Sequence, residues 1–240
     1  MASTFLNLTN RLLRRINEVE ISEADFSNTR GIQTLAKDAI LDSIAQINQS
    51  EYEWPFNAAE HTQILAVGQE EYSWPSFFKS ADWNTFQLQK DDSLNINHKR
   101  LKFIERDQYV RYHQDADDDA STTGLACPEV VFPSHGNGYG VSMSPDKQYT
   151  LQFKYFLNPV GLVAHSDTTR IPDTYDNVIL DGGLYYLYMF RDNPESAGVS
   201  IQIFQQGIKN MQGILINKYQ SVYDTRITRN SRSSSDLLGY

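Results

Sequence analysis

The chain has 240 residues, of which 40% are hydrophobic and 21% charged, so it is long enough to bury a sizeable core. A formal net charge of −9 excludes the basic surface with which proteins grip a nucleic-acid backbone. The sequence contains neither an apolar run long enough to span a membrane nor a secretory signal at its start. Its single cysteine, Cys127, excludes a disulfide framework and a multi-cysteine zinc site. We expect a soluble protein made in a reducing compartment.

Residues 1–50 have the apolar spacing of two amphipathic helices. In the first, Leu12 and Leu13 belong to an apolar face, and three arginines lie on the other side: Arg11, Arg14 and Arg15. In the second, apolar residues recur at intervals of three and four from Ile32 to Ile47, and residues 48–50 end the helix. We predict that both helices contribute to one bundle.

Residues 51–170 change to short, partly alternating runs that predict a β domain. The clearest strand is Tyr149–Leu157, and Ser144–Lys147 before it predicts a hairpin turn. Aromatic residues crowd the start of this region: Tyr52, Trp54, Trp74, Phe77, Phe78, Trp83 and Phe86. They are typical of a domain core, although a sugar-binding platform would use the same residue types. We predict a small antiparallel barrel or sandwich.

Residues 171–223 return to helical spacing. Pro172 and Asp173 suit a first helical turn, and the Gly182-Gly183 pair indicates either close contact with a neighbouring backbone or a helix irregularity. A second helix follows from about residue 195. Its predicted buried face is Val199, Ile203, Phe204, Ile208, Met211, Ile214 and Leu215. The predicted fold is α+β: a four-helix bundle, two helices from each end of the chain, with an inserted β domain.

Residues 224–240 have a different composition. Three arginines alternate with Ser and Asn, and the chain ends on apolar residues: Arg226, Arg229, Arg232, Leu237, Leu238 and Tyr240. This segment cannot bury enough apolar surface to fold alone. It is either a disordered end or an extended arm that becomes ordered on a partner.

The residue types that carry catalysis or bind cofactors form only weak patterns. The run from His113 to Asp119 is rich in oxygen ligands but lacks the glycine and glutamate of an EF-hand loop. It predicts a solvated acidic loop, with a divalent-cation site as the alternative. Cys127 and His135 could suggest a nucleophile pair, but glycine and serine around His135 indicate a loop. We predict no catalytic residues, no cofactor and no metal.

Four stretches of the sequence resemble the head-to-tail adaptor proteins of tailed bacteriophages, the group that includes tail tubular protein A. They are residues 48–56 with Trp54-Pro-Phe, residues 64–75 with Trp74-Pro, residues 144–159 with the Pro-Asp turn and Asn158-Pro, and residues 171–196. Their order and spacing, rather than any single motif, carry the resemblance over residues 5–215. Residues 94–128, with their acidic run, depart from it and predict an elaborated β insertion.

This resemblance implies a structural protein of the virion neck, made in the host cytoplasm, and not an enzyme. Adaptors of this type form a ring, usually of twelve copies, beneath the portal protein, extend the DNA channel and dock the tail nozzle. DNA would pass through such a ring without specific binding. By the same resemblance, residues 224–240 would be the arm that reaches the portal. Arg226, Arg229 and Arg232 would pair with portal acids, and Leu237, Leu238 and Tyr240 would anchor in an apolar groove.

Two other functions remain open from the residues alone. A carbohydrate-binding or carbohydrate-cleaving virion protein would use the aromatic cluster and a pair of carboxylates in a cleft. A plain interaction module with a helical bundle and a β domain would not need the C-terminal arm for partner binding.

Overall fold

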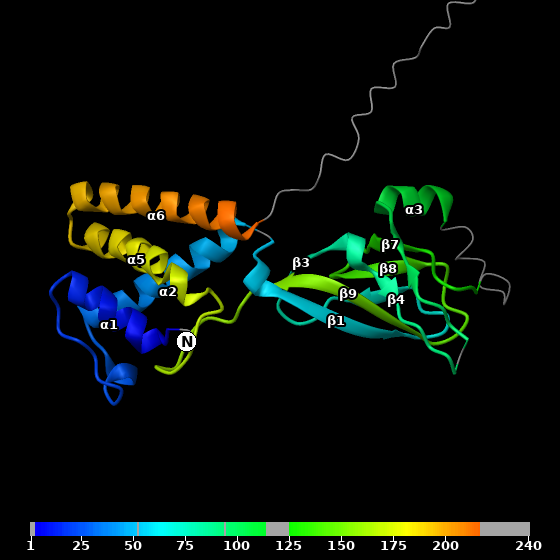
Figure 1. Ribbon diagram of the computed structural model, residues 1–240, viewed down its shortest axis with the longest axis horizontal. Coiled ribbons are helices and arrows are strands. Elements are labelled where there is room, and N and C mark those ends of the chain that lie inside the picture. The colour runs from blue at the N-terminus through cyan, green and yellow to red at the C-terminus, as the bar shows by residue number, and fades with distance from the viewer. Residues whose placement is uncertain (1–2, 52, 94, 114–124, 217–240) are drawn as a thin grey trace, which may run out of the picture.

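The computed structural model describes residues 3–51, 53–93, 95–113 and 125–216. Within these ranges the chain is elongated, with a helical part at one end and a β part at the other (Figure 1). The predicted α+β class is confirmed. The helical part combines segments from both ends of the described chain, whereas the β part runs without interruption from β1 to β9.

The first two helices are α1, Phe5–Arg15, and α2, Ile32–Ser50, as the apolar spacing predicts. Thr4 caps α1, since its hydroxyl accepts a hydrogen bond of 3.2 Å from the Asn7 backbone N–H. The Asn10 side chain then bonds both the N–H and the carbonyl of Ile21, at 2.8 and 2.9 Å. These bonds fold the loop after α1 back against the helix.

The other long helices are α5, Asp176–Phe190, and α6, Pro194–Leu215, preceded by a 3₁₀ turn at Asp173–Tyr175. Asn193 caps α6 through a 3.2 Å bond from the Ser196 N–H. All four helices share one hydrophobic core. Its fully buried members include Leu8, Leu12, Leu13, Ile40, Ile47, Trp54, Ile179 and Phe204.

Gly182 and Gly183 lie at the tightest contacts of this core. A Cβ atom on Gly182 would lie 2.3 Å from Ser43 Oγ and 2.8 Å from the Phe204 ring, and one on Gly183 would meet Leu12 at 2.9 Å. The Ser43 hydroxyl also donates a 2.8 Å hydrogen bond to the Ile179 carbonyl. The glycine pair therefore does mark a close approach, but to side chains of neighbouring helices rather than to a backbone.

The first sheet of the β part is built around β9, Tyr149–Leu157, the strand predicted from alternation. Its order is β1–β9–β4–β5, and β3 also pairs with β9. The other strands are β1, Ala58–Leu65; β3, Phe78–Ala81; β4, Gln87–Leu88; and β5, Lys99–Arg100. All pairings in this sheet are antiparallel.

The second sheet has the order β2–β8–β7–β6, with β6 and β7 parallel. Its strands are β2, Glu71–Ser73; β6, Lys102–Phe103; β7, Val130–Pro133; and β8, Gly138–Ser142. Both sheets share one aromatic-rich core, which includes Phe86, Tyr139 and Phe153. Of the predicted barrel or sandwich, the barrel is wrong, because the strands divide into two separate sheets. The predicted antiparallel pairing fails at β6, which is parallel to β7.

The predicted hairpin at Ser144–Lys147 is also wrong. These residues connect β8 to β9, but the two strands belong to different sheets, so the connection is a crossover. The Pro145 carbonyl accepts a 2.9 Å bond from the Gly68 N–H, and the Tyr149 hydroxyl donates a 2.6 Å bond to Asp146. A Pro-Asp pair turns the chain in either topology, so turn chemistry alone does not reveal the partner strand.

Helix α3, Arg106–Tyr112, lies within the segment predicted to be elaborated, but the sequence reasoning did not identify it as a helix. It packs on β7 through Tyr109, whose ring stacks on Phe132 with a centroid distance of 3.8 Å. A single buried residue in seven gives no amphipathic period long enough to read.

The two parts are joined by buried polar contacts at the end of α2. The Trp54 indole donates a 2.7 Å bond to the Ile47 carbonyl, and the Asn57 amide donates a 2.9 Å bond to Asn48. Lys79 of β3 donates to the Glu51 carbonyl at 2.7 Å and also to the Asn48 carbonyl. Trp54 therefore belongs to the helical core and not to the β domain.

Candidate assembly surfaces

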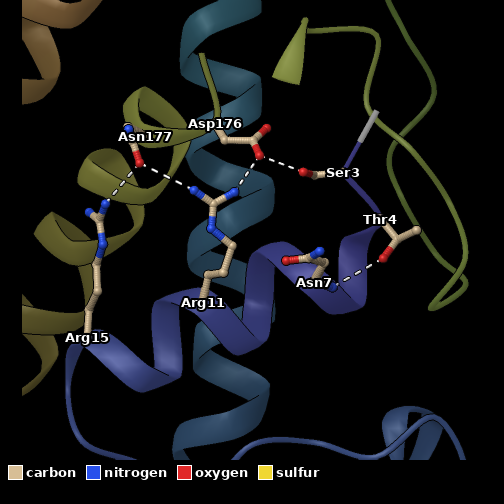
Figure 2. A network of polar contacts seen from close by, with 7 residues as sticks. All are labelled: Ser3, Thr4, Asn7, Arg11, Arg15, Asp176 and Asn177. Carbon is tan, nitrogen blue, oxygen red and sulfur yellow. Dashed lines mark hydrogen bonds and ion pairs between the residues drawn. The ribbon is translucent and has the colours of Figure 1, made fainter. Parts of the chain in front are cut away.

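The polar face of α1 is directed against α5 (Figure 2). The Arg11 guanidinium pairs with Asp176, which also accepts a 2.5 Å bond from the Ser3 hydroxyl. Asn177 accepts bonds from Arg11 at 3.3 Å and Arg15 at 3.1 Å. Two of the three arginines predicted opposite the apolar face of α1, Arg11 and Arg15, thus hold two helices together.

The remaining basic residues near this face are also engaged. Arg15 pairs with Asp181 at 2.7 Å, Arg14 pairs with Glu20 at 2.9 Å, and Arg191 pairs with Glu18. These side chains are committed to carboxylates of the same chain. The arginines of α1 consequently do not form a free anion-binding patch.

The outer flank of α6 carries exposed apolar side chains that sequence reasoning placed in the core. Val199 is 59% exposed, Ile203 52% and Ile214 71%, whereas Phe204, Ile208 and Met211 are buried as predicted. A hollow of about 380 Å³ runs beside them between α5 and α6. Its lining includes Val178, Asp181, Ile203 and Gly207. We call Val199, Ile203, Ile214 and this hollow the α6 face.

The outer side of α2 borders a larger hollow of about 640 Å³ at the junction of the two parts. Its walls come from α2, from Phe77, and from the segment between β9 and α5. Phe77 is 61% exposed and Val160 63% exposed, so two large apolar side chains face this space. The predicted burial of Phe77 in the aromatic core is therefore wrong. We call this hollow the α2 groove. Its walls lie far apart in the sequence, so no short motif could predict it.

The aromatic cluster of the β part is occupied by contacts among its own rings. Trp74 stacks on Phe78 at 4.0 Å, and Trp83 stacks on Phe86 at 5.3 Å. Both tryptophans pack against the shared core of the two sheets. Ring faces used in this way favour the core interpretation over a sugar platform.

The weak catalytic and metal candidates do not form a site in the described part of the chain. The Cys127 sulfur lies 4.0 Å from Lys99 Nζ, while His135 lines a separate depression with Arg106 and Arg111. His113 ends α3, and the acidic residues that follow it up to Asp119 lie outside the described residues. Among the described residues, no group of three or more metal-binding side chains is found, and no helix has the length and apolarity to cross a membrane.

The predicted portal-binding residues cannot be placed. Arg226, Arg229, Arg232, Leu237, Leu238 and Tyr240 all lie in 217–240, outside the described residues. The structure does show where α6, the helix that precedes this segment in the sequence, ends. Near the end of α6, the Gln212 amide donates a 3.4 Å bond to the Ser50 carbonyl at the end of α2. The described chain therefore ends, at residue 216, near the junction of the two parts.

Comparison with protein families decides the assignment. The chain matches the family described as SU10 adaptor protein over residues 3–231. The chain belongs to the SU10 adaptor protein family. No curated protein sequence matches it well enough to count as a relative.

The family match confirms the resemblance to phage head-to-tail adaptors and, with it, a structural adaptor role in the phage neck. It covers both the helical part and the β part of the adaptor. It also extends beyond α6 to include Arg226 and Arg229, and it stops before Arg232 and the apolar end.

Proposed function

We propose that this adaptor forms a ring beneath the portal protein, extends the DNA channel and docks the tail. The observation that carries the proposal is the family match, because it spans nearly the whole chain and not one domain of it. In this arrangement α1, α2, α5 and α6 form a four-helix bundle that builds the ring wall. By resemblance to this class of adaptor, the proposed copy number is twelve.

The charge of the chain supports a channel through which DNA slides. Each copy has a formal net charge of −9. A ring of such copies repels the phosphate backbone, so DNA passes without adhering. The arginines of α1 are paired within the chain, so they leave this overall repulsion in place.

We further propose that residues 224–240 are the arm that binds the portal. Helix α6, which precedes the arm in the sequence, ends beside α2 near the junction of the two parts. Its arginines pair with portal acids and Leu237, Leu238 and Tyr240 enter an apolar groove. A ring of arms would add many weak contacts through avidity.

The first test is the mass of the purified adaptor mixed with portal, measured by light scattering after size exclusion. Twelve copies of a 27.5 kDa chain would add about 330 kDa. A gain of that order supports the ring beneath the portal. No gain at several salt concentrations, with both proteins folded, would contradict it.

Deletion of residues 225–240 tests the arm. We expect portal binding to be lost while the thermal melting temperature is unchanged, because a segment that orders only on a partner adds no stability to the free chain. If the deletion instead lowers the free energy of unfolding by several kcal/mol, the segment is part of the fold and the proposal fails.

Reversal of Arg226, Arg229 and Arg232 to Glu tests the electrostatic contacts. We expect weaker portal association, with the largest loss of affinity at low ionic strength, because salt screens exposed charge pairs. Replacing the three arginines with Lys is the matched control and should retain most of the affinity. A loss that does not change with salt would contradict the electrostatic contribution.

A further inference from the structure

The α6 face and the α2 groove lie on opposite sides of the helical part. Ser43 marks the side of α2 that meets α5, since its hydroxyl bonds the Ile179 carbonyl. A helix turns about 100° per residue, so Leu41 and Ala45 lie about 160° and 200° around α2 from Ser43. Both residues line the α2 groove. The groove therefore faces away from α5 and α6.

The same reasoning orients the α6 face. Phe204 is directed at Gly182 in the core, and Ile203 and Val199 lie about 100° and 140° around α6 from it. They share the flank on which Gly207 meets Val178 of α5. The opposite flank of α6, with Lys209, borders α2 instead. The α6 face is thus directed away from α2 and from its groove.

Both surfaces carry little charge on a strongly acidic chain. Between residues 196 and 215 Lys209 is the single charged residue, and it lies on the flank that borders α2. In the hollow of the α6 face, Asp181 is neutralised by Arg15 at 2.7 Å. The α2 groove has two charged lining residues, Asp42 and Arg170, of opposite sign. Copies with a net charge of −9 repel one another, so nearly neutral apolar surfaces are where they can approach.

We propose that the α6 face of one copy docks into the α2 groove of a second copy. Because these are two different surfaces on opposite sides of one chain, the contact is head-to-tail, and each copy has one of each surface to offer. Apolar side chains meet across it: Val199, Ile203 and Ile214 from one copy, Phe77 and Val160 from the next. The proposal rests on the proposed ring and specifies which surfaces close it.

The test is cross-linking with a short bismaleimide, in full-length chains whose Cys127 has been replaced by Ser. One variant carries Ile203→Cys and Val160→Cys together, and two others carry one substitution each. Every variant is treated alone at high concentration and again with purified portal. Thermal melting checks that each variant folds before it is scored, and light scattering records its mass gain on portal.

The double variant should give a ladder of covalent multiples of the chain. Each single variant should remain monomeric, and a mixture of the two single variants should give dimers and nothing larger. A double variant with Ile203→Cys and Val110→Cys, an exposed residue of α3, is the matched control and should give no ladder. Dimers from the Ile203→Cys variant alone would show a symmetric contact and overturn the proposal.

The outcomes also separate this contact from portal docking. A ladder in the absence of any mass gain on portal would support the contact between copies and contradict portal docking. A mass gain on portal with no ladder would leave portal docking standing and overturn this contact. Neither a ladder nor a mass gain would contradict both.

Discussion

The helical and β parts of the molecule are built from the chain in opposite ways. The helical part joins α1 and α2 to α5 and α6, so its core forms only after residues far apart in sequence meet. The β part uses the uninterrupted stretch from β1 to β9 and has its own core. We therefore expect the β part to fold by itself, whereas the helical part depends on both ends of the chain.

The two parts also differ in how their large apolar side chains are arranged. The helical part has apolar side chains on its α6 face and along the α2 groove, with a hollow beside each. In the β part, large aromatic rings such as Trp74 and Trp83 pack against one another, although Ile64, Val67 and Tyr112 are exposed. This arrangement supports the proposal that contacts between copies involve the helical part and its junction with the β part, where Phe77 lies.

The largest expected effect comes from destabilising one core while the other stays folded. Phe204→Ala removes a fully buried ring from the helical core and should cost about 3–5 kcal/mol of unfolding free energy. Because the β part has its own core, hydrogen exchange followed by mass spectrometry should show faster exchange in 5–50 and 171–215, while the described strands between 58 and 157 stay protected. Equal loss of protection in both parts would show that they unfold as one unit.

The matched control for this variant lies in the other core. Phe153→Ala removes a ring that is 1% exposed and stacks on Phe86 at 4.3 Å, so a similar cost of about 3–5 kcal/mol is expected. Here the loss of protection should fall on 58–157. If Phe153→Ala also exposes the helical segments, the helical part depends on the β part and the comparison is reversed.

Sequence reasoning succeeded where one periodic signal decides the element. The apolar spacing located α1, α2, α5 and α6, and alternation located Tyr149–Leu157. It failed where the structure depends on which strand or helix an element packs against. The Pro-Asp turn before β9 looks the same in a hairpin and in a crossover, and the apolar period of α6 does not say which flank meets a neighbour. Val199 and Ile203 continue that period and yet are exposed, as they would be if a second molecule supplied their partner.

The candidate site was even less accessible to sequence reasoning. The α2 groove is formed where α2, Phe77 and the segment after β9 come together, and only the tertiary structure brings these walls into contact. The arginines of residues 224–240, in contrast, stand out by composition, and their portal-binding role is what the family resemblance implies. They remain a prediction, since they lie outside the described residues.

A smaller effect is expected from the contact between α1 and α5 in Figure 2. Arg11→Met leaves the buried carboxylate of Asp176 without its cation and should lower the free energy of unfolding by about 2 kcal/mol. The Arg11→Met/Asp176→Asn double variant should recover part of this loss, because no buried charge remains. Urea unfolding followed by circular dichroism measures both.

The matched control is Arg14→Met, on the same helix. Its pair with Glu20 is about half exposed on both sides, so its removal should cost less than about 0.5 kcal/mol. Equal effects of Arg11→Met and Arg14→Met would mean that the α1–α5 network contributes no more than an ordinary surface pair.

The smallest expected effect concerns the segment that leads from the β part back to the helices. The Asp167 carboxylate accepts 2.8 Å bonds from the backbone N–H groups of Val163 and Ala164, and these bonds hold its pKa below the ordinary 3.8. In turn the Asp167 carbonyl accepts a 2.8 Å bond from the Phe5 N–H, which ties this segment to the start of α1.

A carboxyl group whose pKa is lower in the folded state stabilises the fold above its unfolded pKa, and the stabilisation is lost as pH falls through the folded pKa. The urea midpoint of the parent should therefore exceed that of Asp167→Asn at pH 6, and the difference should shrink as pH falls below about 3.8. Ser166→Ala, an uncharged change in the same loop, should differ from the parent by an amount that does not vary with pH. A constant difference for Asp167→Asn as well would mean that its carboxylate bonds to Val163 and Ala164 do not stabilise this segment in the folded chain.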